Sequence, residues 1–124
     1  MYMSKRIIII LGVLLLASLP AVAAQTGYSS IIDDLPLMKE MTEKPDDTVV
    51  FDKPAGRIIE ITAETSAAMP EIRKFYDDTL PPLGWKMSAP LKFIRDNEML
   101  KIRIEQTEET TLVHFTLTPH SEGK

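Results

Sequence analysis

One segment of this 124-residue chain has the period of an α-helix, and strand-like segments lie on both sides of it. Four apolar side chains recur on one helical face, namely Ile72, Phe75, Tyr76 and Leu80. Pro70 suits the first turn of this helix, and Pro81-Pro82 ends it, because proline disfavours helical geometry in the residue before it. Each parallel strand pair needs a crossover connection, which one helix cannot supply repeatedly. The sheet is therefore expected to be antiparallel.

The strand segments alternate between apolar and polar residues, as half-buried strands do. The expected strands are residues 49–52, 57–63, 85–88, 91–95, 99–106 and 111–118. Lys53-Pro54-Ala55-Gly56 and Asp96-Asn97 are typical of tight hairpin turns. Segments 85–88 and 91–95 flank Ala89-Pro90 and are two strands or one bent strand.

These elements predict a two-layer α+β fold in the order β-β-α-β-β-β, with one amphipathic helix packed on an antiparallel sheet of four to six strands. The apolar faces of the helix and strands form the predicted core. Its members are Ile59, Ile61, Ile72, Phe75, Tyr76, Leu80, Trp85, Leu100, Ile102, Ile104, Val113, Phe115 and Leu117.

Residues 1–24 have the three-part pattern of a secretory signal peptide. Lys5 and Arg6 precede 13 uncharged, largely apolar residues at 7–19, and Ala21-Val22-Ala23-Ala24 follows Pro20. An uncleaved anchor would need roughly 20 apolar residues to span the bilayer. We expect cleavage after Ala23 or Ala24, which leaves a periplasmic or secreted protein with no stable membrane anchor.

The remaining 100 residues divide into three parts and are enough for one domain. Residues 25–47 are expected to form an irregular N-terminal arm, residues 48–118 the α+β domain and residues 119–124 a disordered tail. Without the leader, 12 basic residues face 18 acidic ones, a net charge of −6. This charge argues against nucleic acid as a partner. The oligomeric state is left open.

Strand alternation places four residues on the sheet face opposite the predicted helix, namely Ile58, Ile94, Leu112 and His114. Such an apolar face is usually covered or used for binding. Two interpretations follow. In the favoured one, the arm covers this face with Ile31, Leu35, Leu37 and Met38. In the other, a partner binds there, and the four residues form a candidate binding site.

No motif for catalysis or metal binding is present. His114 and His120 are the only histidines, lie six residues apart and belong to no metal-binding motif. The serines lie in no nucleophile motif, and the chain has no phosphate loop and no cysteine. We therefore predict no catalytic residues, no metal, no cofactor and no enzymatic activity.

The alternative is a small periplasmic hydrolase that uses scattered carboxylates. It requires two or more of five acidic residues to converge in a concave pocket. The five are Asp52, Glu60, Glu64, Asp77 and Asp78.

Three stretches carry a resemblance to a known group of proteins. They are Leu35-Pro36-Leu37-Met38, residues 50–58 and Phe75-Tyr76-Asp77-Asp78-Thr79-Leu80-Pro81-Pro82-Leu83-Gly84-Trp85. Together they resemble small exported proteins of proteobacteria, chiefly alphaproteobacteria, to which no function is assigned. The resemblance implies export and a small α+β domain, and it carries no catalytic residues. Met69 stands where such relatives often have Ser or Asp before the helix proline, so a capping side chain is missing.

Taken together, these patterns predict a non-enzymatic periplasmic or secreted domain that binds a protein or an envelope component.

Overall fold

The computed structural model describes residues 27–121. The predicted leader and its cleavage site lie outside these residues. The elements in chain order are β1 (Gly27–Tyr28), β2 (Pro36–Leu37), β3 (Thr42–Glu43), η1 (Pro45–Asp47), β4 (Val49–Lys53), β5 (Gly56–Thr65), α1 (Met69–Thr79), η2 (Pro81–Leu83), β6 (Lys86–Ala89), β7 (Lys92–Arg95), β8 (Glu98–Gln106) and β9 (Thr111–Pro119).

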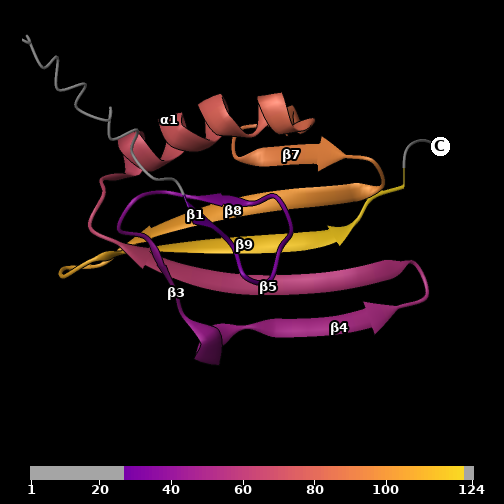
Figure 1. Cartoon of the computed structure of the whole chain (residues 1–124), viewed down its shortest axis with the longest axis horizontal. Helices are drawn as coiled ribbons and strands as arrows, with labels where there is room; N and C mark the ends of the chain where they lie inside the picture. Colours follow the sequence, from indigo (N-terminus) through magenta and orange to yellow (C-terminus); the bar gives the residue numbers. More distant parts are fainter. Residues whose placement is uncertain (1–26, 122–124) are drawn as a thin grey trace, which may run out of the picture.

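Helix α1 packs on an antiparallel sheet, which confirms the two-layer α+β prediction (Figure 1). The sheet has seven strands in the order β3-β5-β9-β8-β7-β6, and β4 also pairs with β5. Strands β3 and β4 share one edge of β5, because β3 pairs near Ala63-Glu64 and β4 pairs with residues 56–60.

Strands β6 and β7 pair with each other as a hairpin, so they are two strands and not one bent strand. Leu91 turns this hairpin with a φ of 59°, and its carbonyl accepts a hydrogen bond from the Ile102 N–H at 2.9 Å. The sheet has one strand more than the predicted maximum of six, because the arm contributes β3. The turn predicted at Asp96-Asn97 is confirmed, with Asp96 at a φ of 53°.

The core lies between α1 and the sheet. Ile72, Tyr76 and Leu80 are fully buried, whereas Phe75 is only partly buried against the core. Residues 72, 76 and 80 form the narrow stripe that faces the sheet, and Phe75 lies on the flank of that stripe. Its ring meets the Tyr76 ring edge-on, with 4.9 Å between centroids.

Most of the predicted core is confirmed, with two corrections. Phe75 and Ile104 are only partly buried. Ile104 lies near the C-terminal end of β8. The prediction missed Ile32, Leu35, Leu37, Met41, Ala63 and Phe93, all of which are buried.

The N-terminal arm packs on the same sheet face as α1, so the favoured interpretation of its position is wrong (Figure 1). The Tyr76 hydroxyl donates a hydrogen bond to the Pro36 carbonyl at 2.9 Å and lies 3.5 Å from the Met41 sulfur. Geometry explains the position. An 11-residue helix is about 16 Å long and about 10 Å wide, and seven strands make a much wider sheet. The arm covers the part of this face that α1 leaves open.

The arm is more ordered than the predicted irregular segment. Its strands β1 and β2 pair with each other. The Glu43 carboxylate accepts hydrogen bonds from the hydroxyls of Ser29 at 2.7 Å and Ser30 at 3.0 Å. These bonds tie the start of the arm to β3, and through β3 to the main sheet.

The end of strand β9 and the start of helix α1 differ slightly from the prediction. Strand β9 runs to Pro119, and the His120 N–H donates to the Asn97 carbonyl at 2.6 Å, so the predicted tail begins later than residue 119. Helix α1 begins after Ala68, which provides no capping side chain.

Candidate binding surface on the second face of the sheet

The face opposite α1 and the arm, called here the second face, carries the four residues predicted as a binding site. Ile58 and Ile94 each adjoin a buried core residue on their strand, and Leu112 and His114 flank buried Val113. Because side chains alternate along a strand, all four point away from the core. Each is half-buried.

The structure separates these four residues along the second face. Ile58 and Ile94 lie at the end where β9 finishes, and Leu112 lies where β9 begins. Leu112 is six residues from Thr118, about 20 Å along the strand. Leu112 pairs with Glu64 on one side and Glu105 on the other, so acidic residues flank it.

Two further apolar residues join Ile58 and Ile94. Phe51 of β4 pairs with Ile58, and Met99 of β8 pairs with Ile94. Thr118 of β9 pairs with Met99 and lies between the two halves. Phe51, Ile58, Met99 and Ile94 therefore form a line across the sheet, called here the apolar row. The Phe51 side chain is 42% exposed.

Sequence reasoning missed Phe51 and Met99. The two-residue turn between Lys53 and Gly56 was a usable signal, because it sets Phe51 opposite Ile58. The register of β7 against β8 provides the same information for Met99. Both follow from hairpins that were themselves predicted.

Three lysines lie beside the apolar row. Lys86 pairs with Ile94, and Lys92 pairs directly with Lys101 on the neighbouring strand. Two like charges directly opposite each other destabilise a sheet. Among the described residues, no ion pair involves any of these three lysines. This end of the second face is therefore apolar and locally basic, although the chain as a whole is acidic.

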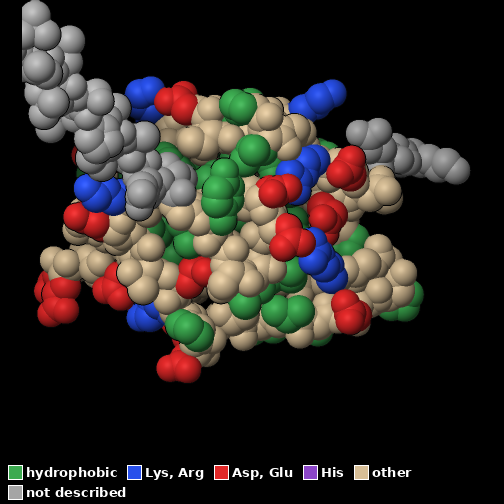
Figure 2. Space-filling model, viewed as in Figure 1, with side chains coloured by type: hydrophobic (Ala, Val, Ile, Leu, Met, Phe, Trp, Pro, Cys, Tyr) green, Lys and Arg blue, Asp and Glu red, His purple; other side chains and the backbone are tan. Residues whose placement is uncertain are grey.

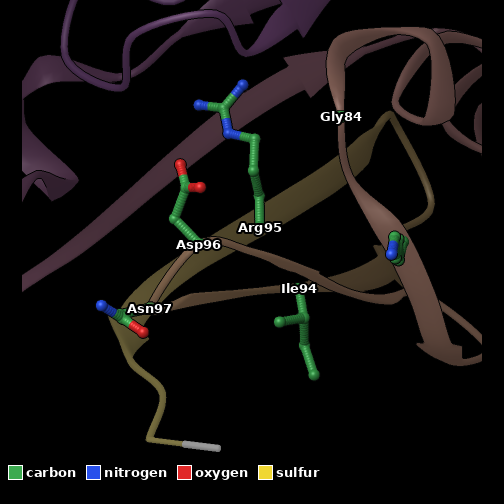
Figure 3. A pocket seen from close by; sticks show the side chains of 6 residues that line it. Gly84, Ile94, Arg95, Asp96 and Asn97 are labelled. Carbon is green, nitrogen blue, oxygen red and sulfur yellow. The ribbon is translucent and has the colours of Figure 1, made fainter.

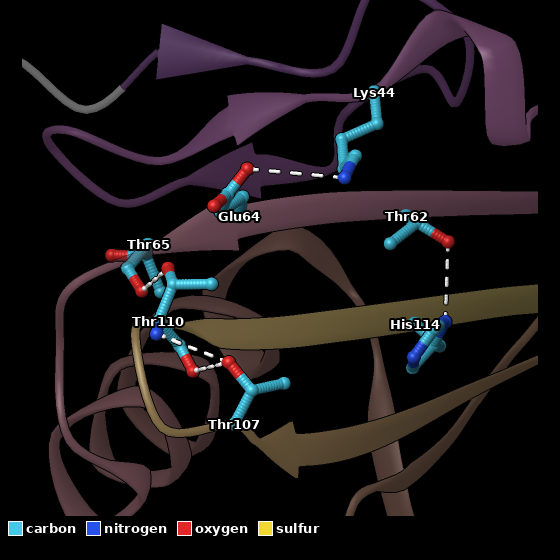
Figure 4. A network of polar contacts seen from close by, with 7 residues as sticks. All are labelled: Lys44, Thr62, Glu64, Thr65, Thr107, Thr110 and His114. Carbon is cyan, nitrogen blue, oxygen red and sulfur yellow. Dashed lines mark hydrogen bonds and ion pairs between the residues drawn. The ribbon is translucent and has the colours of Figure 1, made fainter.

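His114 lies in a polar cluster in the middle of the second face. Its Nδ1 lies 3.1 Å from the Thr62 Oγ1 (Figure 4). Its Nε2 lies 2.9 Å from the Glu105 carboxylate. A neutral imidazole satisfies both contacts if Nε2–H donates to Glu105 and Nδ1 accepts from the Thr62 hydroxyl. Arg103 lies 3.9 Å from the same carboxylate.

The Thr62–His114–Glu105 arrangement places a hydroxyl, an imidazole and a carboxylate in series. Acyl transfer by such a set also needs donors for the developing oxyanion. Strands β5, β9 and β8 are paired throughout this region, so their backbone N–H groups are already hydrogen-bonded within the sheet. Thr62 itself is only 8% exposed. The contacts to Thr62 and Glu105 hold His114 in position on the sheet.

The five carboxylates of the hydrolase alternative do not converge. Glu60 and Glu64 lie four residues apart on the second face, about 13 Å along β5. Asp77 and Asp78 lie on α1, which covers the opposite face. Asp52 is adjacent to Phe51 on β4 and points to the other side of that strand.

A shallow hollow of about 630 Å³ lies at the β6–β7 edge, next to the apolar row (Figure 3). Its lining residues are Gly84, Lys86, Ile94, Arg95, Asp96 and Asn97. Ile94 and Arg95 point in opposite directions in Figure 3. The Arg95 guanidinium stacks on the Trp85 ring at 4.5 Å and donates to the Leu83 carbonyl at 3.1 Å. The Arg95 side chain is thus held by contacts within the domain, whereas Ile94 and Lys86 lie at the surface.

Residues 27–121 contain no cluster of three or more His, Asp or Glu side chains placed to hold a metal ion. In the same part of the chain, no helix is long and apolar enough to cross a membrane. No known protein family, curated protein or solved structure matches the chain.

Proposed function

We propose that this chain is an exported, non-enzymatic domain of the periplasm or the extracellular space that binds a protein or an envelope component through the apolar row. The apolar row carries the proposal, because it is a line of half-exposed apolar side chains on a face that no described part of the chain covers. Exposed apolar side chains grouped in this way typically mark a binding site.

The proposed location rests on the leader pattern of residues 1–24. The separation of the five carboxylates, and the pairing of the described strands around His114, also support a non-enzymatic role.

The charges beside the apolar row define the kind of partner. Lys86, Lys92 and Lys101 surround Ile94 and Met99, so the partner surface should be apolar with acidic groups at its margin. Electrostatic complementarity of this kind raises the association rate and weakens with salt.

The test is cross-linking of the tagged protein in the periplasm of the expressing cells, followed by identification of the captured component. Ile94→Asp should abolish capture, because it places a charge within the apolar row. Met87→Asp is the matched control. Met87 is 49% exposed on the neighbouring strand but pairs with core residue Phe93, so it points to the opposite face. Equal capture by both variants, or no reproducible capture by the wild-type protein, would refute the proposal.

A further inference from the structure

The two lateral edges of the sheet differ in how they are protected. Strand β6, at one edge, has four residues, begins with Lys86 and carries an irregularity in its pairing between Met87 and Ala89. Short length, lysine and bulges are the devices that prevent edge strands from pairing with other chains. Strand β4, at the other edge, pairs with β5 over all five of its residues without a register shift, and its one lysine, Lys53, lies at the turn.

Strand β4 is also apolar and open to solvent. Val49, Val50 and Phe51 are 44%, 55% and 42% exposed, and all five of its residues are exposed. Hydrophobic side chains lie among charged ones along the lower margin of the molecule, where β4 runs (Figures 1 and 2). A regular, apolar edge strand is a template for a further strand.

The hairpin determines which backbone groups of β4 are available. Lys53 pairs with Gly56 across the two-residue turn. Phe51 and Val49 follow at every second position, so their backbone groups point the same way as those of Lys53. In an antiparallel ladder, alternate residues point their N–H and C=O groups toward the partner strand. Lys53, Phe51 and Val49 bond to β5, so Val50 and Asp52 present their N–H and C=O groups outward. The Thr48 N–H is already bonded to the Pro45 carbonyl at 3.1 Å.

The charges along this edge are self-complementary. Asp46 and Asp47 precede β4, and Lys53 ends it. An antiparallel second copy, centred on Val50, brings Lys53 of each chain to the acidic turn of the other. The same register sets Phe51 opposite Val49 and lets the two Val50 residues exchange both backbone hydrogen bonds. A parallel arrangement would instead place the acidic turns together.

We propose that β4 pairs with β4 of a second copy of this chain, which joins two sheets into one across a two-fold axis. The dimer is closed, because each β4 is used once and the outer edges are then the protected β6 strands. The contact is small, so the dissociation constant is expected to be on the order of 100 μM. This inference does not rest on the ligand proposed for the apolar row, and the two surfaces share only Phe51.

The test is sedimentation equilibrium of the purified protein from about 10 μM to 1 mM, a range that brackets this constant. Wild-type protein should shift from monomer to dimer. Val50→Lys should weaken the dimer about tenfold or more, because two like charges then meet at the two-fold axis. Met87→Lys adds the same charge at the protected edge and should leave the dimer unchanged. Circular dichroism establishes that each variant is folded.

Two further measurements locate the contact. Lys53→Glu, at an exposed site, should also weaken the dimer, and the added acidic repulsion should be reduced by salt. Hydrogen exchange at the Val50 and Asp52 amides should slow as protein concentration rises, while exchange at Met87 stays constant. A wild-type protein that is monomeric at 1 mM, or a dimer weakened equally by Val50→Lys and Met87→Lys, would overturn the proposal.

Discussion

The two faces of the sheet are formed by alternate residues of the same strands, but they differ in how deeply those residues are buried. On the covered face, Val113, Phe115 and Leu117 of β9 are almost completely buried under α1 and the arm. On the second face, the intervening residues His114 and Thr116 remain half-exposed. Within residues 27–121, the hydrophobic core therefore lies on one side of the sheet only. The apolar row contributes little to that core, which is why we propose it as the binding surface.

The covered face itself has two different covers. The helix covers it with Ile72, Tyr76 and Leu80, a periodic pattern visible in the sequence. The arm covers the rest with Ile32, Leu35, Leu37 and Met41, which follow no helical or strand period. Regular periodicity in the sequence thus identifies the residues with which the helix covers the sheet, but not those of the arm.

The largest expected effect comes from making the same substitution, phenylalanine to alanine, on each face of the sheet. Phe115→Ala should lower the free energy of unfolding by about 3–5 kcal/mol, because Phe115 is fully buried beneath the Tyr76 ring. Phe51→Ala should cost less than about 1 kcal/mol, since an exposed side chain leaves no cavity. Urea denaturation measures both, and similar losses would mean that the second face is also part of the core.

A second pair tests the arm as part of the core. Leu35→Ala should cost about 2–3 kcal/mol, because Leu35 is 1% exposed in the same cluster as Tyr76. Ile31→Ala should cost less than about 1 kcal/mol, because Ile31 is 38% exposed. Thermal unfolding followed by circular dichroism gives both values. A negligible loss for Leu35→Ala would show that the arm lies on the sheet without stabilising it.

The smallest expected effect concerns the contact between helix and arm. Burial raises the pKa of Tyr76, and the nearby Glu43 carboxylate raises it further. An unfolded tyrosine ionises near pH 10. The Tyr76 contribution to stability is therefore intact below about pH 10, and above it falls by up to about 1.4 kcal/mol per pH unit, because only the unfolded state releases the proton.

The matched variant is Tyr76→Phe. At neutral pH it should cost about 1 kcal/mol, since the Pro36 carbonyl loses its donor. Above pH 10 its free energy of unfolding should fall less steeply than that of the wild-type protein. Denaturant titrations from pH 8 to 11 measure both curves, and parallel curves would contradict the assignment.

Local patterns were enough to predict the helix, the hairpins and most of the sheet core. The stripe of Ile72, Tyr76 and Leu80 and the turn at Asp96-Asn97 depend on residues close together in the chain, which is why they could be read directly. The same alternation placed Ile58 and Ile94 on the second face. The predicted set lacked Phe51 and Met99, because these two residues join Ile58 and Ile94 only through strand pairing.

The errors arose where distant segments compete for the same surface. The arm was expected on the second face because that face has apolar residues without a cover. The structure places it beside α1, where the helix is too short to cover the sheet and where the Tyr76 hydroxyl binds the Pro36 carbonyl. No local pattern in residues 27–44 indicates which face they contact.

The sequence by itself determined the class of fold, since one helical segment among alternating strands permits only a helix packed on an antiparallel sheet. It also determined which residues of each strand point the same way, because side-chain alternation is a property of the extended backbone. Only the tertiary structure decided which face the arm covers and which strand edge stays open. Those outcomes depend on how much area each face leaves unburied after the helix has packed, a quantity that exists only when all the elements are assembled.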